Sequence, residues 1–302
     1  MMKRHQAVGV GCVSVMAMMA MMAMMAMSAC SGDDNASPAD SGLPLVDRGA
    51  DLSGTCGGGV CPENSTCVQD VCECDENYWP STDASACVPV DIDTGIVTYY
   101  PMNGDATDVS GQGQDCLVNG PTLAADRFGE ADGAYAFDGV DDYLQCGVGG
   151  AWQTFGTPTW TFAAWFTITG DGDDAQTLLN GIYHRPWITV NNSNHVHLAY
   201  MDQEANYTPS ASTEIGAIVP NEWVHIVLVS DGEKYIHYVN GEKSGEREWG
   251  AIGLSGVDHY RIGNTPNGEE NFKGRIDDVL LYNRVLSAEE ANALWAISSV
   301  TD

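Results

Sequence analysis

The hydrophobic residues of this chain fall into short runs that alternate with polar residues, and these runs predict β-strands. The apolar face of the run 161–168 consists of Phe162, Ala164, Phe166 and Ile168. Residues 223–229 are apolar on both faces, as in a central strand that is covered on both sides. Asp231-Gly232 and Asn240-Gly241 flank the run 234–239, and these dipeptides are typical of tight hairpin turns. Regularly spaced short strands with little helical periodicity predict an all-β, two-sheet sandwich.

The strand expected at residues 276–282 has an aspartate beside an apolar face. Alternation assigns Ile276, Leu280 and Tyr282 to one face, and assigns Asp277, Val279 and Leu281 to the other. A carboxylate beside a buried apolar face needs a partner, which can be backbone N–H groups, an arginine or a metal.

A single short helix is expected near the C-terminus. Ser287 and Glu290 have the spacing of a capping box, in which each residue bonds to the backbone N–H of the other. Ala291, Leu294 and Trp295 then share one apolar face.

The first 30 residues have the features of an export signal. A positive start is followed by an uncharged Met- and Ala-rich run over 7–26, which can enter a bilayer as a helix. The sequence Met-Ser-Ala-Cys at 27–30 resembles a bacterial lipobox. This resemblance implies a signal peptide over 1–29, a lipid on Cys30 and, because Ser31 follows, attachment to the outer membrane. A soluble secreted form and an uncleaved membrane-spanning anchor are the alternatives.

The next segments are a tether and a cysteine-rich module. Residues 30–52 are polar and acidic and predict a flexible tether. The six cysteines that follow are Cys56, Cys61, Cys67, Cys72, Cys74 and Cys87. Residues 53–90 are too few to bury a sufficient core, so disulfides must stabilise them, and spacing alone allows fifteen pairings.

The cysteine pattern resembles an EGF-like module, with Cys61 and Cys67 separated by five residues and Cys72-Glu-Cys74 followed by Tyr78. The resemblance implies the pairs Cys56–Cys67, Cys61–Cys72 and Cys74–Cys87. An unrelated disulfide knot is the alternative. Residues 51–55 lack the acidic pattern of calcium-binding members, so we expect no calcium in this module.

Four stretches in the remaining chain resemble the laminin-G-like, concanavalin-A-like jelly roll family. They are 100–113, 126–143, 223–241 and 272–290, in the order found in that family. The resemblance implies one domain over 95–302 with two antiparallel sheets packed face to face. Cys116 and Cys146 are the two cysteines of this domain, and we expect them to pair; two free thiols are the alternative.

The acidic composition limits the possible partners. The chain has 12 basic and 42 acidic residues, a net charge of −30, which becomes −32 when Lys3 and Arg4 are removed with the signal peptide. This charge opposes binding to nucleic acid or anionic lipid and suits a structural calcium. The residues that could supply calcium ligands are Asp105, Asp108, Asp138 and Asp277. Aspartates that cap turns are the alternative interpretation.

Aromatic and histidine residues offer further candidate sites. Trp187, which follows Arg185-Pro186, and Trp249, in a Gly-flanked loop, are the candidates for exposed rings that stack on sugars. A zinc site is the less favoured interpretation of the histidines His195, His197, His225 and His237.

The sequence lacks the motifs of the common hydrolases. It has no Glu-x-Asp-x-x-Glu or Glu-x-Asp-x-Glu cluster and no Gly-x-Ser-x-Gly. Glu246 and Glu248 alternate on an expected edge strand, but no third acid joins them, so we expect them to face the solvent. We therefore expect a non-catalytic recognition protein of the cell envelope that binds a glycan or protein ligand. A structural subunit of a surface complex is the main alternative, and a polysaccharide hydrolase is a distant one.

Processing at Cys30 is directly testable. We expect the mature chain to begin at a lipidated Cys30 and to fractionate with the outer membrane. Mass spectrometry of the N-terminal peptide checks this, and an unmodified Cys30 in a released form would contradict it.

Overall fold

The structure is a computed structural model that describes most of the chain from residue 55 onward. The described residues are 55–56, 59–68, 71–75, 77–81, 84–147, 157–169, 175–181, 186–191, 193–201, 207–213, 218–248 and 259–298. The side chains of 55–56, 59–60, 199–201 and 207–212 are not described. Three features predicted from the sequence, the signal peptide with Cys30, the tether and Trp249, lie outside these residues. Within the described part, no helix is long and apolar enough to cross a membrane.

The cysteine-rich segment consists of three short antiparallel ladders. They are β1 (Thr55–Cys56) with β2 (Gly59–Val60), β3 (Ser65–Val68) with β4 (Val71–Cys74), and β5 (Tyr78–Pro80) with β6 (Cys87–Pro89). Disulfides join Cys61 to Cys72 and Cys74 to Cys87, which are two of the pairs named above. Cys67 is also disulfide-bonded. The side chain of Cys56 is not described, so the Cys56–Cys67 pair stays a prediction.

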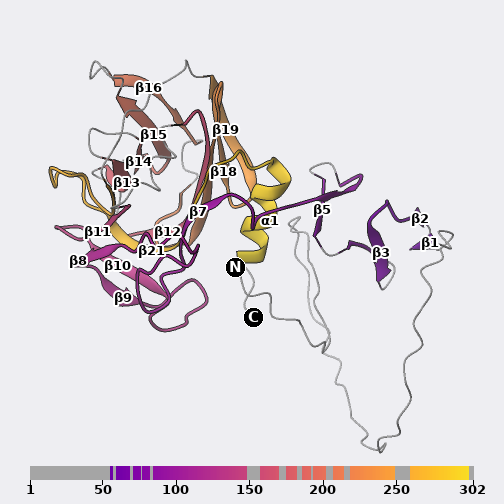
Figure 1. Ribbon diagram of the computed structural model, residues 1–302, viewed down its shortest axis with the longest axis horizontal. Helices are drawn as coiled ribbons and strands as arrows, with labels where there is room; N and C mark the ends of the chain where they lie inside the picture. Colours follow the sequence, from indigo (N-terminus) through magenta and orange to yellow (C-terminus); the bar gives the residue numbers. More distant parts are fainter. Residues whose placement is uncertain are drawn as a thin grey trace, which may run out of the picture. The chain divides into compact units, whose positions relative to one another are not determined.

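The rest of the chain forms two antiparallel sheets (Figure 1). The eight-stranded sheet has the order β19 (Glu242–Glu248), β18 (Lys234–Val239), β17 (Val224–Asp231), β12 (Thr159–Ile168), β21 (Lys273–Tyr282), β10 (Ala134–Asp138) and β9 (Thr122–Ala124), with β7 (Ile96–Tyr100) also paired to β21. The seven-stranded sheet has the order β16 (Tyr207–Ser212), β15 (Val196–Met201), β14 (Trp187–Val190), β13 (Gln176–Gly181), β20 (Tyr260–Ile262), β11 (Tyr143–Cys146) and β8 (Leu117–Asn119). With the short C-terminal helix α1 (Ala288–Ser298), this confirms the predicted jelly-roll sandwich.

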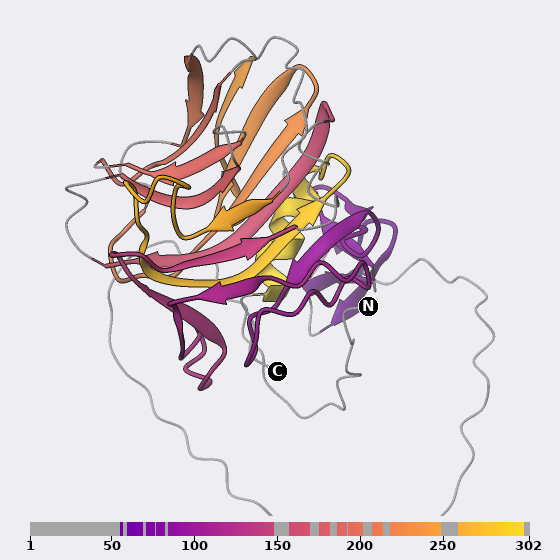
Figure 2. The ribbon, with the colours of Figure 1, turned by 60° about the vertical axis from the view of Figure 1, so that its left-hand side comes forward.

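The core lies between the two sheets, whose strands Figure 2 shows in two layers. The apolar face of β12 lies in this core, as the alternation predicts. The neighbouring strand β17 is buried along almost its whole length, so it is covered on both faces, also as predicted. From the seven-stranded sheet, the core receives Leu144, Leu179, Ile188, Leu198 and Ile262. A disulfide joins Cys116 to Cys146 at the end where β8 and β11 pair, as expected.

The predicted faces of the strand at 276–282 were wrong. The residues of β21 that enter the core are Ile276, Val279 and Leu281. The register with β12 shifts between Ala163 and Trp165, and Asp278 has a φ of 47°. A bulge of this kind adds one residue to a strand, so every later side chain changes face. Leu280 and Tyr282 therefore lie on the side opposite Ile276.

The bulge lets two consecutive aspartates reach one arginine. Arg127 forms ion pairs with both Asp277 and Asp278, and the side chains of Arg127 and Asp277 are at most 9% exposed. The guanidinium also lies 4.9 Å from the Trp165 ring, which packs 5.0 Å from His225 on the neighbouring strand. This group covers part of the outer face of the eight-stranded sheet, the face that points away from the core.

Helix α1 covers another part of that outer face. The predicted capping box forms, because Ser287 N–H donates to Glu290 and Glu290 N–H donates to the Ser287 hydroxyl. A Cβ added to Gly241, in the turn between β18 and β19, would lie 2.8 Å from atoms of Asn292 and Trp295. Figures 1 and 2 both show α1 against the eight-stranded sheet, on the side away from the seven-stranded sheet. Parts of the outer face of the eight-stranded sheet are therefore covered by the chain itself.

The buried His237 makes stability depend on pH. Its side chain is fully buried, and neither ring nitrogen has a hydrogen-bond partner in the described structure. Burial lowers the pKa of His237 to about 4, with a smaller effect from His197, whereas the unfolded chain titrates near about 6.5. Between pH 6.5 and about pH 4, only the unfolded state takes up this proton. The contribution of neutral His237 to the free energy of unfolding is therefore complete above pH 6.5 and is lost as the pH falls to about 4.

We expect His237→Leu to flatten this dependence. Between pH 7 and pH 4.5, its free energy of unfolding should fall less than that of the wild type, by on the order of 1–3 kcal/mol. Urea titrations at several pH values measure the difference. His259→Leu, which changes a half-buried histidine, is the matched control and should keep the wild-type slope. Parallel curves for His237→Leu and wild type would refute the assignment.

Candidate functional site

The outer face of the seven-stranded sheet carries a row of polar and aromatic side chains. Gln145 on β11 pairs with Arg261 on β20, Arg261 pairs with Asn180 on β13, and Asn180 pairs with Trp187 on β14. Directly paired residues of an antiparallel sheet point to the same side. The core residues on these strands are the neighbours of this row in sequence, so the row lies on the outer side of the sheet. Gln145, Arg261 and Trp187 are half-buried there, whereas Asn180 is fully buried. We call these four residues the polar row.

The Trp187 end of the row is tied to a carboxyl group. The Trp187 indole donates to the Thr177 hydroxyl at 3.1 Å, and this hydroxyl donates to Glu270 at 3.3 Å. Thr177 is fully buried and Trp187 is half-buried, so the ring is held in place while part of it stays accessible. Burial raises the pKa of Glu270, and the nearby Glu269 adds to this effect.

The Arg261 end of the row is held by an aromatic ring and an amide. The guanidinium lies 4.1 Å from the centre of the Tyr143 ring, and it donates a long bond of 3.4 Å to Asn264. Asn264 and Thr265 are buried and begin the loop that leads to Glu270. The Thr265 hydroxyl accepts from the backbone N–H groups of Glu269 and Glu270, which fixes the course of this loop.

This arrangement is suited to binding a polar, ring-shaped molecule. Amide groups and a guanidinium can bond to hydroxyl groups, and a half-exposed indole can pack on an apolar ring face. Of the two aromatic residues predicted to bind a ligand, Trp187 lies in this row, and Trp249 falls outside the described residues. Gln145, Asn180, Arg261 and Glu270 were not predicted from the sequence, because only the strand register brings them together.

The four aspartates proposed as calcium ligands have different surroundings. The Asp108 carboxylate accepts backbone N–H groups from Tyr99, Ser110 and Gln114, all at 3.0 Å. Asp105 accepts from the Thr107 N–H, and Asp277 is paired with Arg127. These contacts match the capping role and the arginine partner that the sequence also allowed.

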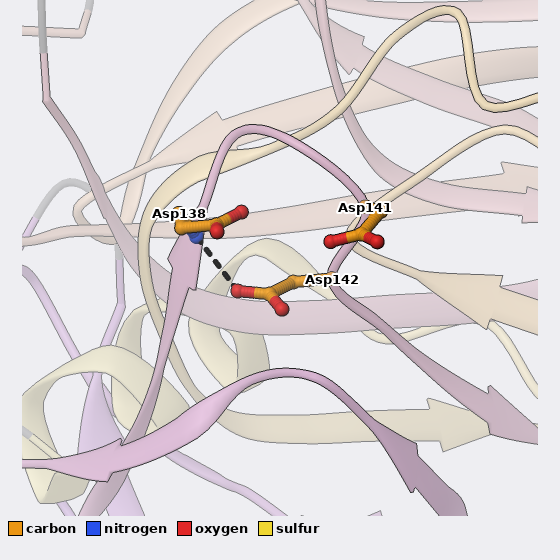
Figure 3. A group of neighbouring side chains, drawn as sticks. All are labelled: Asp138, Asp141 and Asp142. Atoms are coloured by element: carbon orange, nitrogen blue, oxygen red, sulfur yellow. Dashed lines mark hydrogen bonds between the residues drawn. The ribbon is translucent and has the colours of Figure 1, made fainter.

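Asp138 lies in a different group, with Asp141 and Asp142 (Figure 3). One carboxylate oxygen from each lies within 4.8 Å of the others, and this is the one such group with metal-ligand potential among the described residues. Asp142 is buried, which raises its pKa, while Asp138 and Asp141 are exposed. A hard cation such as calcium binds oxygen ligands, and three convergent carboxylates supply part of the set that it needs.

The histidines do not form a cluster. The rings of His195 and His197 lie 4.8 Å apart on β15 and its approach, but no third ligand joins them among the described residues. His225 stacks on Trp165 at the outer face of the eight-stranded sheet, whereas His237 pairs with the core residue Leu228. These last two therefore lie on opposite faces.

Glu246 is exposed and pairs with Lys234 and Lys243, as a solvent-facing residue on an edge strand does.

Comparison with known proteins gives matches to part of the chain. A decay-accelerating factor of trypomastigotes, from Trypanosoma cruzi, is 41% identical over 68 residues, which are 21% of this chain and 70% of that protein. The binding domain of botulinum neurotoxin serotype D matches 68% of this chain and 52% of its own, with a TM-score of 0.56 and 16% identity. The binding domain of botulinum neurotoxin DC, in complex with SialylT, matches 70% and 53% with a TM-score of 0.58 and 13% identity.

The two solved chains share the fold, and this chain spans about half of their length. A family model matches residues 138–292, just over half of the 302 residues. That range contains the three aspartates of Figure 3 and every residue of the polar row. The chain belongs to the Laminin_G_3 family, of the concanavalin A-like lectin/glucanases superfamily.

Proposed function

We propose that this protein is a non-catalytic recognition protein that binds a glycan on the outer face of its seven-stranded sheet. The observation that carries the proposal is the polar row with the half-buried Trp187 at its end. Trp187 is anchored through its indole N–H, so the ring is oriented before a ligand arrives. Such preorganisation lowers the entropy cost of binding.

The opposite face of the sandwich offers less room for a ligand. Arg127 and helix α1 cover parts of the outer face of the eight-stranded sheet, and Trp165 and His225 are buried there. The seven-stranded sheet instead presents half-buried polar side chains at Gln145 and Arg261. The binding surface is therefore assigned to the seven-stranded sheet.

The names of similar proteins support a glycan as the ligand. The family description covers lectins and glucanases, and the similar solved structures are toxin binding domains. Two of these were solved in complex with SialylT and with N-acetylneuraminic acid. At identities of 13–16% these structures establish a shared fold, and the ligand class is our inference for this chain.

The cellular setting of the proposal comes from the N-terminal sequence. The lipobox-like residues 27–30 favour a lipid anchor on Cys30, and the polar residues 30–52 would hold the folded part away from the outer membrane. The protein would then act as a recognition protein of the cell envelope. A structural subunit of a surface complex would use the same fold without a soluble ligand.

A polysaccharide hydrolase is less well supported. Hydrolysis of a glycosidic bond ordinarily uses two carboxyl groups on either side of the bond. The polar row contains no carboxyl group. Glu270 is linked to the row through Thr177, whose hydroxyl also accepts the bond from Trp187. Incubation of the purified protein with polysaccharides and detection of reducing ends would reveal such an activity.

We also propose that calcium stabilises the sandwich through the group of Asp138, Asp141 and Asp142. Three carboxylates within 4.8 Å of one another repel, and a divalent cation relieves this repulsion by coordination. The strongly negative charge of the chain adds to the attraction. The calcium ligands suggested by the sequence were Asp105, Asp108, Asp138 and Asp277, and this proposal keeps only Asp138.

Glycan binding should depend on Trp187. We expect Trp187→Ala to weaken binding to the best glycan of an array by about tenfold or more, as for an aromatic residue at the centre of an interface. Trp223→Ala, which removes a half-buried indole beside Arg275 on the other sheet, is the matched control and should bind normally. An array without any bound glycan, together with specific capture of a protein partner, would favour the structural role instead.

Calcium should raise the melting temperature. At a hundredfold excess over its dissociation constant, calcium would add about 2.7 kcal/mol, which corresponds to a gain on the order of 5 °C. Asp141→Asn should lose this gain. Asp277→Ala should instead lower the melting temperature equally in calcium and in chelator, because its partner is Arg127. Equal melting of the wild type in calcium and chelator at fixed ionic strength would end the calcium proposal.

A further inference from the structure

Arg261 has no carboxylate partner among the described residues, whereas four other basic residues do. The residues that form ion pairs with carboxylates are Arg127, Lys234, Lys243 and Arg284. Within the described part of the chain, the Arg261 guanidinium lies over the Tyr143 ring and donates a bond of 3.4 Å to the amide oxygen of Asn264. Its Nε is buried without a hydrogen-bond partner.

This lack of a partner is informative because carboxylates are so abundant. The sequence has 42 acidic residues against 12 basic ones, so a guanidinium has many possible partners within the chain. Arg261 instead lies between the amide side chains of Gln145 and Asn180 on neighbouring strands. Its guanidinium lies over the Tyr143 ring, a contact that helps to hold the group in place.

We propose that Arg261 binds the carboxylate of an acidic sugar, so that the glycan recognised by this protein carries a uronate or sialate unit. The inference rests on the proposed function and adds the class of glycan. A guanidinium and a carboxylate can form two parallel hydrogen bonds, a geometry that a neutral hydroxyl group does not match. The amide of Gln145 would then bond to a hydroxyl group of the same unit.

The positions along the row also give the ligand an orientation. Arg261 and Trp187 are two strands apart, a separation of about 10 Å that a disaccharide can span. Glu270 lies at the Trp187 end, through Thr177, and would repel a carboxylate there. The acidic unit therefore lies over β20 and β11, and a neutral unit packs on Trp187.

The net charge of −30 opposes any anionic ligand at long range. This repulsion is screened beyond about 8 Å at physiological ionic strength, whereas the contact with Arg261 acts within hydrogen-bond distance. The contact with Arg261 can thus outweigh the general repulsion. The same repulsion would exclude acidic molecules that do not reach Arg261.

The experiment uses a glycan array on which each carboxylated glycan is present both as the free acid and as its methyl ester, beside neutral and sulfated glycans. Esterification removes the charge with little change of shape. We expect the full-length protein to bind at least one free acid about tenfold more tightly than its ester, the size of one charge-assisted hydrogen-bond pair. Arg261→Gln should remove this preference, and Arg261→Lys should retain part of it.

Lys273→Gln is the matched control, because it removes one exposed positive charge from the eight-stranded sheet and should leave the preference unchanged. Equal binding of acid and ester, binding of sulfated glycans only, or an unchanged preference in a folded Arg261→Gln protein would overturn this inference alone. If neutral glycans still bind and Trp187→Ala abolishes that binding, the proposed function holds. Failure to bind any glycan would overturn both.

Discussion

The buried contact of Arg127 with Asp277 and Asp278 fixes the outer face of the eight-stranded sheet and closes part of it. It joins the segment before β10 to the bulge of β21, residues about 150 positions apart in sequence. The ion pairs hold the guanidinium over Trp165, so the outer face of the eight-stranded sheet is closed there. Removing the arginine would leave two carboxylates with little solvent access, and breaking such a buried pair costs roughly 3–5 kcal/mol.

The charges of this contact are only partly balanced. One guanidinium faces two carboxylates, and burial together with Asp278 raises the pKa of Asp277, while Arg127 opposes this effect. The hydroxyl of Tyr99 donates to Asp278 at 2.7 Å and stabilises the second carboxylate. The contact therefore depends on β7, which supplies Tyr99, as well as on β21. This links the start of the sandwich domain to its last strand.

Local patterns in the sequence were sufficient to predict the sandwich. The alternation in β12, the apolar run of β17 and the capping box of Ser287 and Glu290 each act over a few residues, so they can be read directly. The bulge at Asp278 could not be predicted in this way, because it depends on the register with β12. It inverted the expected faces of the second half of β21.

The proposed binding face could not be predicted from local sequence patterns either, apart from Trp187. Trp187 was identified because it follows Arg185-Pro186, but Arg261, Asn180 and Gln145 carry no motif. They become neighbours only through the pairing of β11, β20, β13 and β14, which come from distant parts of the chain. A weak signal existed in Tyr260-Arg261-Ile262, where a charged residue stands between two residues that enter the core.

Hydrogen–deuterium exchange with and without the bound glycan tests the central claim most directly, because it reports on every strand of the wild-type protein. The account predicts slower exchange in β13, β14 and β20 and in the loop from Asn264 to Asn271, with little change in β17, β18 and α1. Protection confined to the eight-stranded sheet or to α1, with β13, β14 and β20 unchanged, would contradict the account.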